Sequence, residues 1–149
     1  MSASRSPGFQ DCNCLAIRQA ARHETQFYDQ LFAPVGLRAT QFAILSRLRR
    51  DGPMTINALA AALVMDRTTL GRNILPLQRD GLVEIVASPS DRRRRELRLS
   101  DAGAEKQRQA TGRWAAAQTR FDAVYGGERA AQLRDLLREV VASEFAAAP

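Results

Sequence analysis

The sequence predicts a mainly α-helical chain that contains one small β-hairpin. Over most of the 149 residues, apolar side chains recur at every third or fourth position, the period of an amphipathic helix. Residues 82–87 and 94–99 depart from this period, because β-favouring side chains there flank a Ser-Pro-Ser-Asp turn cluster. Two short helical segments, 55–63 and 67–79, come directly before this hairpin.

These two short helices are a helix-turn-helix candidate. Thr55 and Asp66 are placed to act as their N-caps. In the second helix, Leu70, Ile74 and Leu77 recur at i, i+4 and i+7, so we expect them to be buried. The opposite side of that helix carries Thr68, Thr69, Arg72, Pro76 and Arg79.

This opposite side has the chemistry to contact a DNA duplex, although core packing alone explains many amphipathic helix pairs. Arginine hydrogen-bonds guanine edges or phosphates, and threonine offers a hydroxyl to the backbone or a methyl group to thymine. We therefore predict DNA contacts from Thr68, Thr69, Arg72 and Arg79. Pro76 removes a backbone hydrogen bond inside this helix, which predicts a kink near Arg72.

The hairpin tip presents the consecutive arginines Arg92 to Arg95 beside Asp91. In isolation such a run is more often a solvated loop. On a hairpin that follows a helix-turn-helix it is typical of a wing, whose arginines enter the minor groove or contact its flanking phosphates. Arg92, Arg93 and Arg95 are therefore predicted to contact DNA.

Composition favours an acidic partner and argues against several other classes of protein. The 22 Lys and Arg against 16 Asp and Glu give a net charge of +6, and nucleic acid suits this balance better than a membrane. The longest apolar run, 58–65, is too short to span a bilayer, and no signal peptide is recognisable, so a cytoplasmic location is expected. A single histidine, with no phosphate-binding loop and no carboxylate pair, predicts no enzyme, cofactor or metal.

Further helices are expected on both sides of this central region, over about 12–32, 39–50, 101–125 and 128–145, after a flexible N-terminus at 1–11. The terminal helices carry more apolar surface than one small lobe can cover, which predicts a homodimer. The competing account is a hairpin of the last two helices that closes on the first helix of the same chain. The predicted dimer contacts are Trp114, Phe121, Leu133, Leu137 and Val140.

The run DGLVEIVASPSDRRRRELRLSDAG resembles the wing signature of the MarR family of bacterial regulators, an Asp-Arg-Arg followed by Leu-x-Leu-Ser and a helix start. LRATQFAILSRL is similar to the family's preceding helix, and the resemblance extends from about Leu15 onward. It implies one domain at 12–149, with a winged helix-turn-helix at about 37–100. It also implies an obligate dimer held by the helices 12–34 and 101–146.

The resemblance also implies roles for individual residues. Asp91 would brace an arginine of the wing, while Arg92 or Arg93 reaches DNA and Arg72 lies in the major groove. The expected function is that of a sequence-specific transcriptional regulator. We expect a homodimeric repressor that binds a pseudo-palindromic operator in double-stranded DNA and is released by a small molecule. A non-specific architectural DNA-binding protein is the alternative from another class.

In the MarR family the effector pocket generally lies between the dimerisation helices and the DNA-binding lobe. The N-terminal helix would pass there, so Arg18, His23, Tyr28 and Phe42 are predicted to contact the ligand, for which a small anionic aromatic molecule is the candidate. His23 is equally explained as an ordinary hydrogen-bonded histidine, and Phe42 as a core residue.

Cys12 and Cys14 are candidates for a thiol switch, the alternative to a ligand-responsive repressor. The family's organic-peroxide sensors keep a reactive cysteine on the first helix. The pattern FQDCNCLAIRQ lacks the tyrosine-containing surroundings expected in those sensors. A thiolate also needs positive charge nearby, for which Arg18 is only a candidate source. Idle thiols are therefore the preferred interpretation of the two cysteines.

Overall fold

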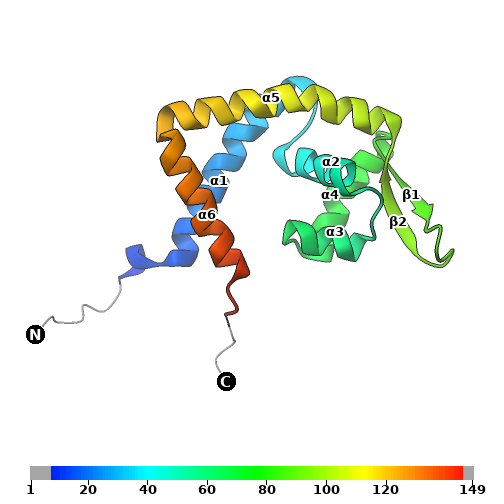
Figure 1. The fold of residues 1–149 in the computed structure, drawn as a ribbon, viewed down its shortest axis with the longest axis horizontal. Coiled ribbons are helices and arrows are strands. Elements are labelled where there is room, and N and C mark those ends of the chain that lie inside the picture. The colour runs from blue at the N-terminus through cyan, green and yellow to red at the C-terminus, as the bar shows by residue number, and fades with distance from the viewer. Residues whose placement is uncertain (1–7, 146–149) are drawn as a thin grey trace, which may run out of the picture.

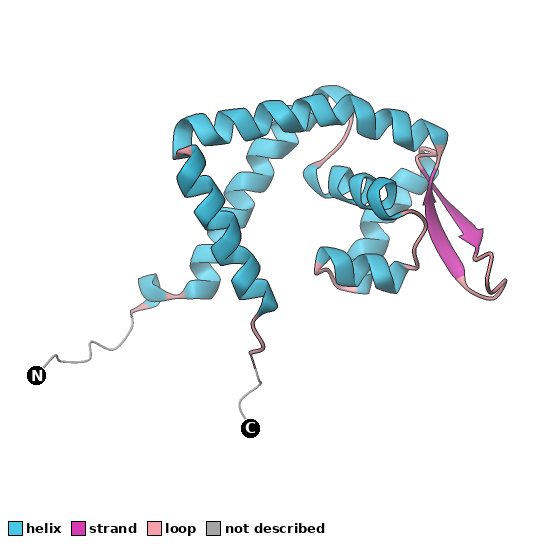
Figure 2. Ribbon diagram, in the orientation of Figure 1, coloured by secondary structure: helices cyan, strands magenta, loops and turns pink. Residues whose placement is uncertain are grey.

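The computed structural model describes residues 8–145 and confirms the predicted fold class (Figures 1 and 2). Expectations about residues 1–7 and 146–149 lie outside the described residues. The last part of the predicted flexible N-terminus, Phe9–Asp11, forms a 3-10 helix, η1. The remaining elements are α1 (Asn13–Phe32), η2 (Ala33–Val35), α2 (Ala39–Asp51), α3 (Ile56–Leu63), α4 (Arg67–Arg79), β1 (Val83–Ala87), β2 (Arg95–Leu99), α5 (Asp101–Tyr125) and α6 (Gly127–Ala142).

The predicted helix starts are confirmed by their side-chain caps. The Thr55 hydroxyl accepts a hydrogen bond from the Ala58 backbone N–H at 3.2 Å, and the Asp66 carboxylate accepts one from the Thr69 N–H at 2.8 Å. The Ser100 hydroxyl likewise accepts from the Gly103 N–H at 3.0 Å. These bonds satisfy N–H groups that have no partner within their helices, which fixes where α3, α4 and α5 begin.

The end of α6 differs from its predicted position, and Pro76 leaves α4 unbroken. The apolar spacing predicts that the last helix reaches Phe145, but the helix ends at Ala142. Phe145 is 79% exposed and offers no packing to hold another turn. Pro76 lies inside α4, which nevertheless continues to Arg79. The proline therefore does not end the helix, and its cost is the helical hydrogen bond to the Arg72 carbonyl.

The core of the helix-turn-helix lobe lies between α2, α3, α4 and the hairpin. As predicted, Leu70, Ile74 and Leu77 of α4 are buried. The other large side chains with exposure of 2% or less are Phe32, Ile44, Leu45, Leu48, Leu59 and Val83. This packing holds the opposite side of α4 toward solvent.

The antiparallel strands β1 and β2 extend from this core. Val83 pairs with Leu99 and Ile85 with Leu97, so the apolar side chains of one face meet at the base of the hairpin. A bridge between Met54 and Leu97 joins the hairpin to the segment before α3. The base of the hairpin is thus anchored, while its tip projects from the lobe (Figure 2).

Helix α5 connects this lobe to the rest of the chain (Figure 1). Its buried Gln107 donates a hydrogen bond to the Ser46 hydroxyl of α2 at 3.3 Å, and its Gln118 bonds the Tyr28 hydroxyl of α1. Helices α1 and α6 lie at the end of α5 away from the hairpin. No helix within residues 8–145 is both long enough and apolar enough to cross a membrane.

Candidate nucleic-acid interface

The solvent-facing side of α4 is the first part of the candidate site. Successive residues of an α-helix are rotated by about 100°, so Thr68 and Arg72 lie opposite the buried Leu70 and Ile74. Thr68, Thr69 and Arg72 are all exposed and occupy the first two turns of the helix. The structure therefore brings these three predicted DNA contacts together on one accessible face.

The Asp66 cap strengthens the start of this helix. Hydrogen bonds from Thr69, first from its side chain and then from its backbone N–H, lower the pKa of the Asp66 carboxyl below its usual value of 3.8. The carboxylate is therefore charged at neutral pH, where it complements the positive end of the helix dipole. This charge stabilises the turn that presents Thr68 and Thr69.

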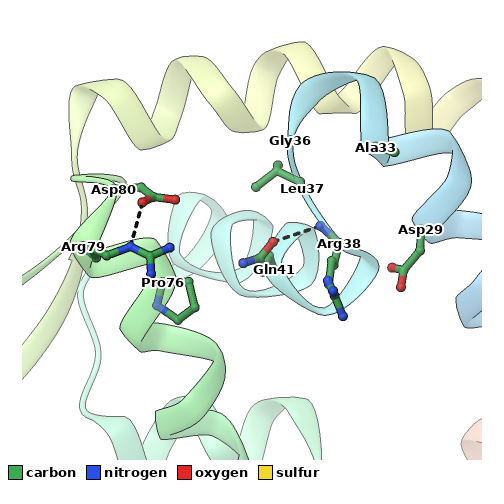
Figure 3. Close-up of a pocket in the computed structure, with 9 residues that line it drawn as sticks. All are labelled: Asp29, Ala33, Gly36, Leu37, Arg38, Gln41, Pro76, Arg79 and Asp80. Carbon is green, nitrogen blue, oxygen red and sulfur yellow. Dashed lines mark hydrogen bonds and ion pairs between the residues drawn. The ribbon is translucent and has the colours of Figure 1, made fainter.

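Arg79, also predicted to contact DNA, lies apart from the other three. It ends α4, about 15 Å along the helix from Thr69 by helical rise. Its guanidinium pairs with the Asp80 carboxylate at 3.2 Å, and both side chains are exposed. Arg79 and Pro76 line a hollow beside α1 and α2 (Figure 3).

Sequence reasoning overlooked Leu75 on the same solvent-facing side. Leu75 is 64% exposed, whereas its neighbour Ile74 is 4% exposed. Leu75 follows Thr68 by seven residues, which is about two helical turns, so both lie on the same face of α4. This spacing could have identified Leu75 from the sequence.

The wing is the second part of the candidate site. Arg92, Arg93, Arg94 and Arg95 are all exposed. Arg95 begins β2 opposite Ala87, so it lies at the base of the tip. Four positive charges therefore project on a narrow hairpin that follows α4 in the chain.

Asp91 bonds one of the arginines of the wing, Arg93, through the backbone N–H of that residue. Its carboxylate accepts the backbone N–H of Arg93 at 2.9 Å, and its carbonyl accepts the N–H of Arg94 at 2.9 Å. The buried Ser88 donates its N–H to the Arg94 carbonyl at 2.9 Å. Asp91 thus shapes the turn through backbone amides and leaves the arginine side chains extended into solvent.

The predicted dimer contacts are partly or largely accessible. Trp114, Leu137 and Val140 are 42%, 41% and 40% exposed. Phe121 is half-buried, and Leu133 lies on the same helix as Leu137. Other large apolar side chains exposed on α5, α6 and the residues after them are Val124, Leu136, Val141 and Phe145. This concentration exceeds the scattered exposed apolar residues of an ordinary surface.

The four predicted ligand contacts do not meet around one cavity. Arg18 and His23 lie on α1, and Arg18 is exposed. Tyr28 bonds Gln118, and burial followed by the charge of Glu24 raises the pKa of its phenol. Phe42 belongs to the core, where its ring lies 4.7 Å from that of Phe32. By helical rise, Arg18 is about 21 Å from Phe32, so it is remote from the Phe42 ring.

An open hollow of about 540 Å³ lies elsewhere, between the α1–α2 corner and the end of α4 (Figure 3). Arg38 and Arg79 contribute positive charge from two sides, and Asp29 and Asp80 contribute negative charge. Asp29 is held by the Ala39 N–H at 2.7 Å, and Gln41 accepts the Arg38 N–H at 2.9 Å. The remaining lining residues are Ala33, Gly36, Leu37, Gln41 and Pro76.

Cys12 and Cys14 are free thiols at the start of α1. The Cys12 sulfur accepts the Leu15 N–H at 3.4 Å, which gives Cys12 a structural role as the N-cap of α1. Cys14 is exposed. Residues 8–145 contain no group of three or more His, Cys, Asp and Glu side chains able to hold a metal ion.

An exposed helix of a helix-turn-helix beside an arginine-tipped hairpin defines a winged helix-turn-helix protein. The MarR family model matches residues 37–94, which span α2 to the wing. The chain belongs to the MarR family of transcriptional regulators. That family consists of regulators and not of enzymes.

Individual relatives agree with this assignment. The HTH-type transcriptional repressor NicR of Pseudomonas putida is 30% identical over 88 residues, which cover 59% of this chain and 56% of NicR. The chain thus matches little more than half the length of that relative. The M. tuberculosis regulator MosR, solved in complex with DNA, is 32% identical with a TM-score of 0.74, covering 90% of this chain and 99% of MosR. Bordetella bronchiseptica BpsR shares the fold, with 23% identity and a TM-score of 0.80 over 94% of this chain and 100% of BpsR.

Proposed function

We propose that the protein is a homodimeric, sequence-specific repressor that binds a pseudo-palindromic operator and is released by a small molecule. The observation that carries this proposal is the position of Thr68, Thr69 and Arg72 on one exposed face, in a lobe that also bears the arginines of the wing. A base-reading helix and a phosphate-binding wing together supply specificity and affinity. The operator would be met in the cytoplasm, where bacterial transcription takes place.

Two relatives support this interpretation. MosR was solved in complex with DNA, and NicR is named as a repressor. A non-specific architectural protein would use the wing and Arg72 for phosphate contacts, whereas a regulator would also use Arg72 to read guanine. The repressor NicR and the regulator MosR therefore favour the regulator over the architectural protein.

The dimer is proposed from the apolar surface of α5 and α6. Leu137, Val140 and Trp114 expose area that a second copy of the same helices would cover. Dimers of helix-turn-helix proteins place two recognition helices one turn of DNA apart, so a symmetric dimer matches an inverted repeat with half-site centres roughly 10 bp apart.

The ligand is proposed to bind in the hollow between Arg38 and Arg79. Residues of α1, of α2 and of the end of α4 line this hollow. A ligand that fits one relative position of these helices better than another would therefore shift the position of α4. The two arginines can pair with the carboxylate of a small ligand. Asp29 and Asp80 would repel a ligand that carries several negative charges. BpsR, which shares the fold, has its DNA binding regulated by 6-hydroxynicotinic acid.

Oxidation of Cys12 or Cys14 is the alternative input. The comparisons lend it no support, and its remaining basis is the proximity of two free thiols at the start of α1. Peroxide treatment of the protein, of Cys12→Ser and of Cys14→Ser, followed by an operator-binding assay, distinguishes a thiol switch from idle cysteines.

Selection of bound fragments from random double-stranded DNA tests the proposed function. The expected product is a family of sequences that share an inverted repeat and that resist competition by bulk DNA. Recovery of random sequences with no common motif would contradict a sequence-specific regulator and favour an architectural protein.

A further inference from the structure

Leu75 is a large apolar side chain left in solvent on the recognition helix. It is 64% exposed, although Leu70, Ile74 and Leu77 of the same helix are buried. It follows Thr68 by two helical turns and lies about 60° around the helix from Arg72. The exposed leucine is therefore part of the face that carries the candidate DNA contacts.

The core of its own lobe cannot cover this side chain, because Leu75 points away from the buried stripe. A second copy of the chain would be an apolar partner, but the other exposed apolar side chains are mostly on α6 and the later part of α5. Helix α6 lies at the end of α5 away from α4 (Figure 1). In the major groove the apolar group on the base edges is the 5-methyl group of thymine. The neighbouring Arg72 adds the positive charge that draws this face toward DNA.

We propose that Leu75 contacts a thymine methyl group in each half-site and thereby determines part of the operator sequence. This inference rests on the proposed function, since it requires that α4 enters the major groove of a specific operator. It adds a position at which thymine is preferred through an apolar contact and not through a hydrogen bond.

Replacement of single thymines by deoxyuridine in the selected operator tests the proposal, because it removes one methyl group and keeps the base pair. Burial of one methyl group is worth about 0.8 kcal/mol, which corresponds to roughly a fourfold change in affinity. We expect at least one thymine per half-site whose replacement weakens binding by about this factor through Leu75, whereas a thymine that contacts Thr68 or Thr69 should keep its response in Leu75→Ala. Leu75→Ala should weaken binding to the thymine operator and should lose the response to deoxyuridine at that position.

Gln78→Ala is the matched control, because Gln78 is exposed on the flank of the same helix. It should keep the full deoxyuridine response. Circular dichroism checks that each variant is folded, and light scattering checks its oligomeric state.

The proposal is overturned if no thymine replacement weakens binding, or if Leu75→Ala responds to deoxyuridine as strongly as the unmodified protein at every thymine whose replacement matters. It is also overturned if Leu75→Ala dissociates into monomers under conditions where the unmodified protein is a dimer. Each of these results leaves operator binding by the unmodified protein intact. Failure to select any operator would instead overturn the proposed function.

Discussion

Gly103, in the first turn of α5, packs directly on the backbone of Leu82, the residue before β1. A β-carbon at Gly103 would overlap the Leu82 carbonyl oxygen and come within 2.8 Å of the Leu99 side chain. The same carbonyl accepts the Ser100 N–H at 3.1 Å, and the Ser100 hydroxyl donates to the Gly81 carbonyl at 2.6 Å. The end of the recognition helix, the hairpin and α5 are thereby joined at one point.

Gly103→Ala should therefore destabilise the protein by about 1–3 kcal/mol, the usual cost of overpacking. Gly112→Ala is the control, because Gly112 lies in the same helix with open space around its α-carbon. That change should stabilise the protein by up to about 1 kcal/mol through helix propensity. Urea denaturation measures both, and equal stability of the two variants would contradict the close packing at Gly103.

Local patterns were sufficient to predict α4. Asp66 caps it, Leu70 to Leu77 supply its buried stripe, and the helix has the predicted bounds Arg67–Arg79. Each of these signals lies within a few residues of the feature it specifies. The same kind of local pattern misplaced the end of α6, because Phe145 continues the apolar spacing without having anything to pack against.

The candidate ligand site could not be predicted in this way. Asp29, Arg38 and Asp80 come together only through the packing of α1, α2 and α4, and no spacing in the sequence records that packing. Phe42 has the sequence pattern of either a core or a pocket residue, and its burial against Phe32 decides for the core. The bond from the Arg93 backbone to Asp91 also depends on the geometry of the turn.

Val64, in the turn between α3 and α4, has left-handed backbone angles of φ 53° and ψ 46°. This conformation costs a residue with a β-carbon about 1–2 kcal/mol, and Val64 is 71% exposed, so little packing compensates. Val64→Gly should raise stability by about 0.5–1 kcal/mol after the greater flexibility of unfolded glycine is subtracted, as thermal or urea unfolding would measure. Val64→Ala keeps the β-carbon and should gain nothing, whereas a less stable glycine variant would show that the valine side chain stabilises the turn.

Leu137→Asp tests the proposed dimer. A charge in the apolar surface of α6 should weaken association by at least about tenfold, since burial of one leucine side chain contributes roughly 1.5–3 kcal/mol. Operator binding should weaken with it. Glu139→Lys changes charge on the opposite side of the same helix and should leave both unchanged. Light scattering at micromolar concentration provides the readout, and a monomeric unmodified protein would rule out the obligate dimer.

Arg38→Ala and Arg18→Ala distinguish the hollow from the site predicted by sequence. If the effector binds between Arg38 and Arg79, Arg38→Ala should keep operator affinity and resist release by the effector, screened among small aromatic carboxylates. Arg18→Ala should be released normally. The reverse pattern would return the ligand site to α1, and loss of DNA binding without ligand in either variant would indicate a structural role.

If α4 reads the operator sequence while the wing binds the phosphate backbone, the ratio of operator affinity to bulk DNA affinity measures this division of roles most directly. Arg72→Ala should lower this ratio, because a bidentate guanine contact discriminates by roughly 1–3 kcal/mol. Replacement of both Arg92 and Arg93 by alanine should weaken both affinities alike and reduce the salt dependence by about 0.9 in log-log slope for each phosphate that the wing no longer neutralises. A double wing variant that lowers the ratio, together with an Arg72→Ala protein that leaves it unchanged, would show that the wing reads sequence and that Arg72 does not.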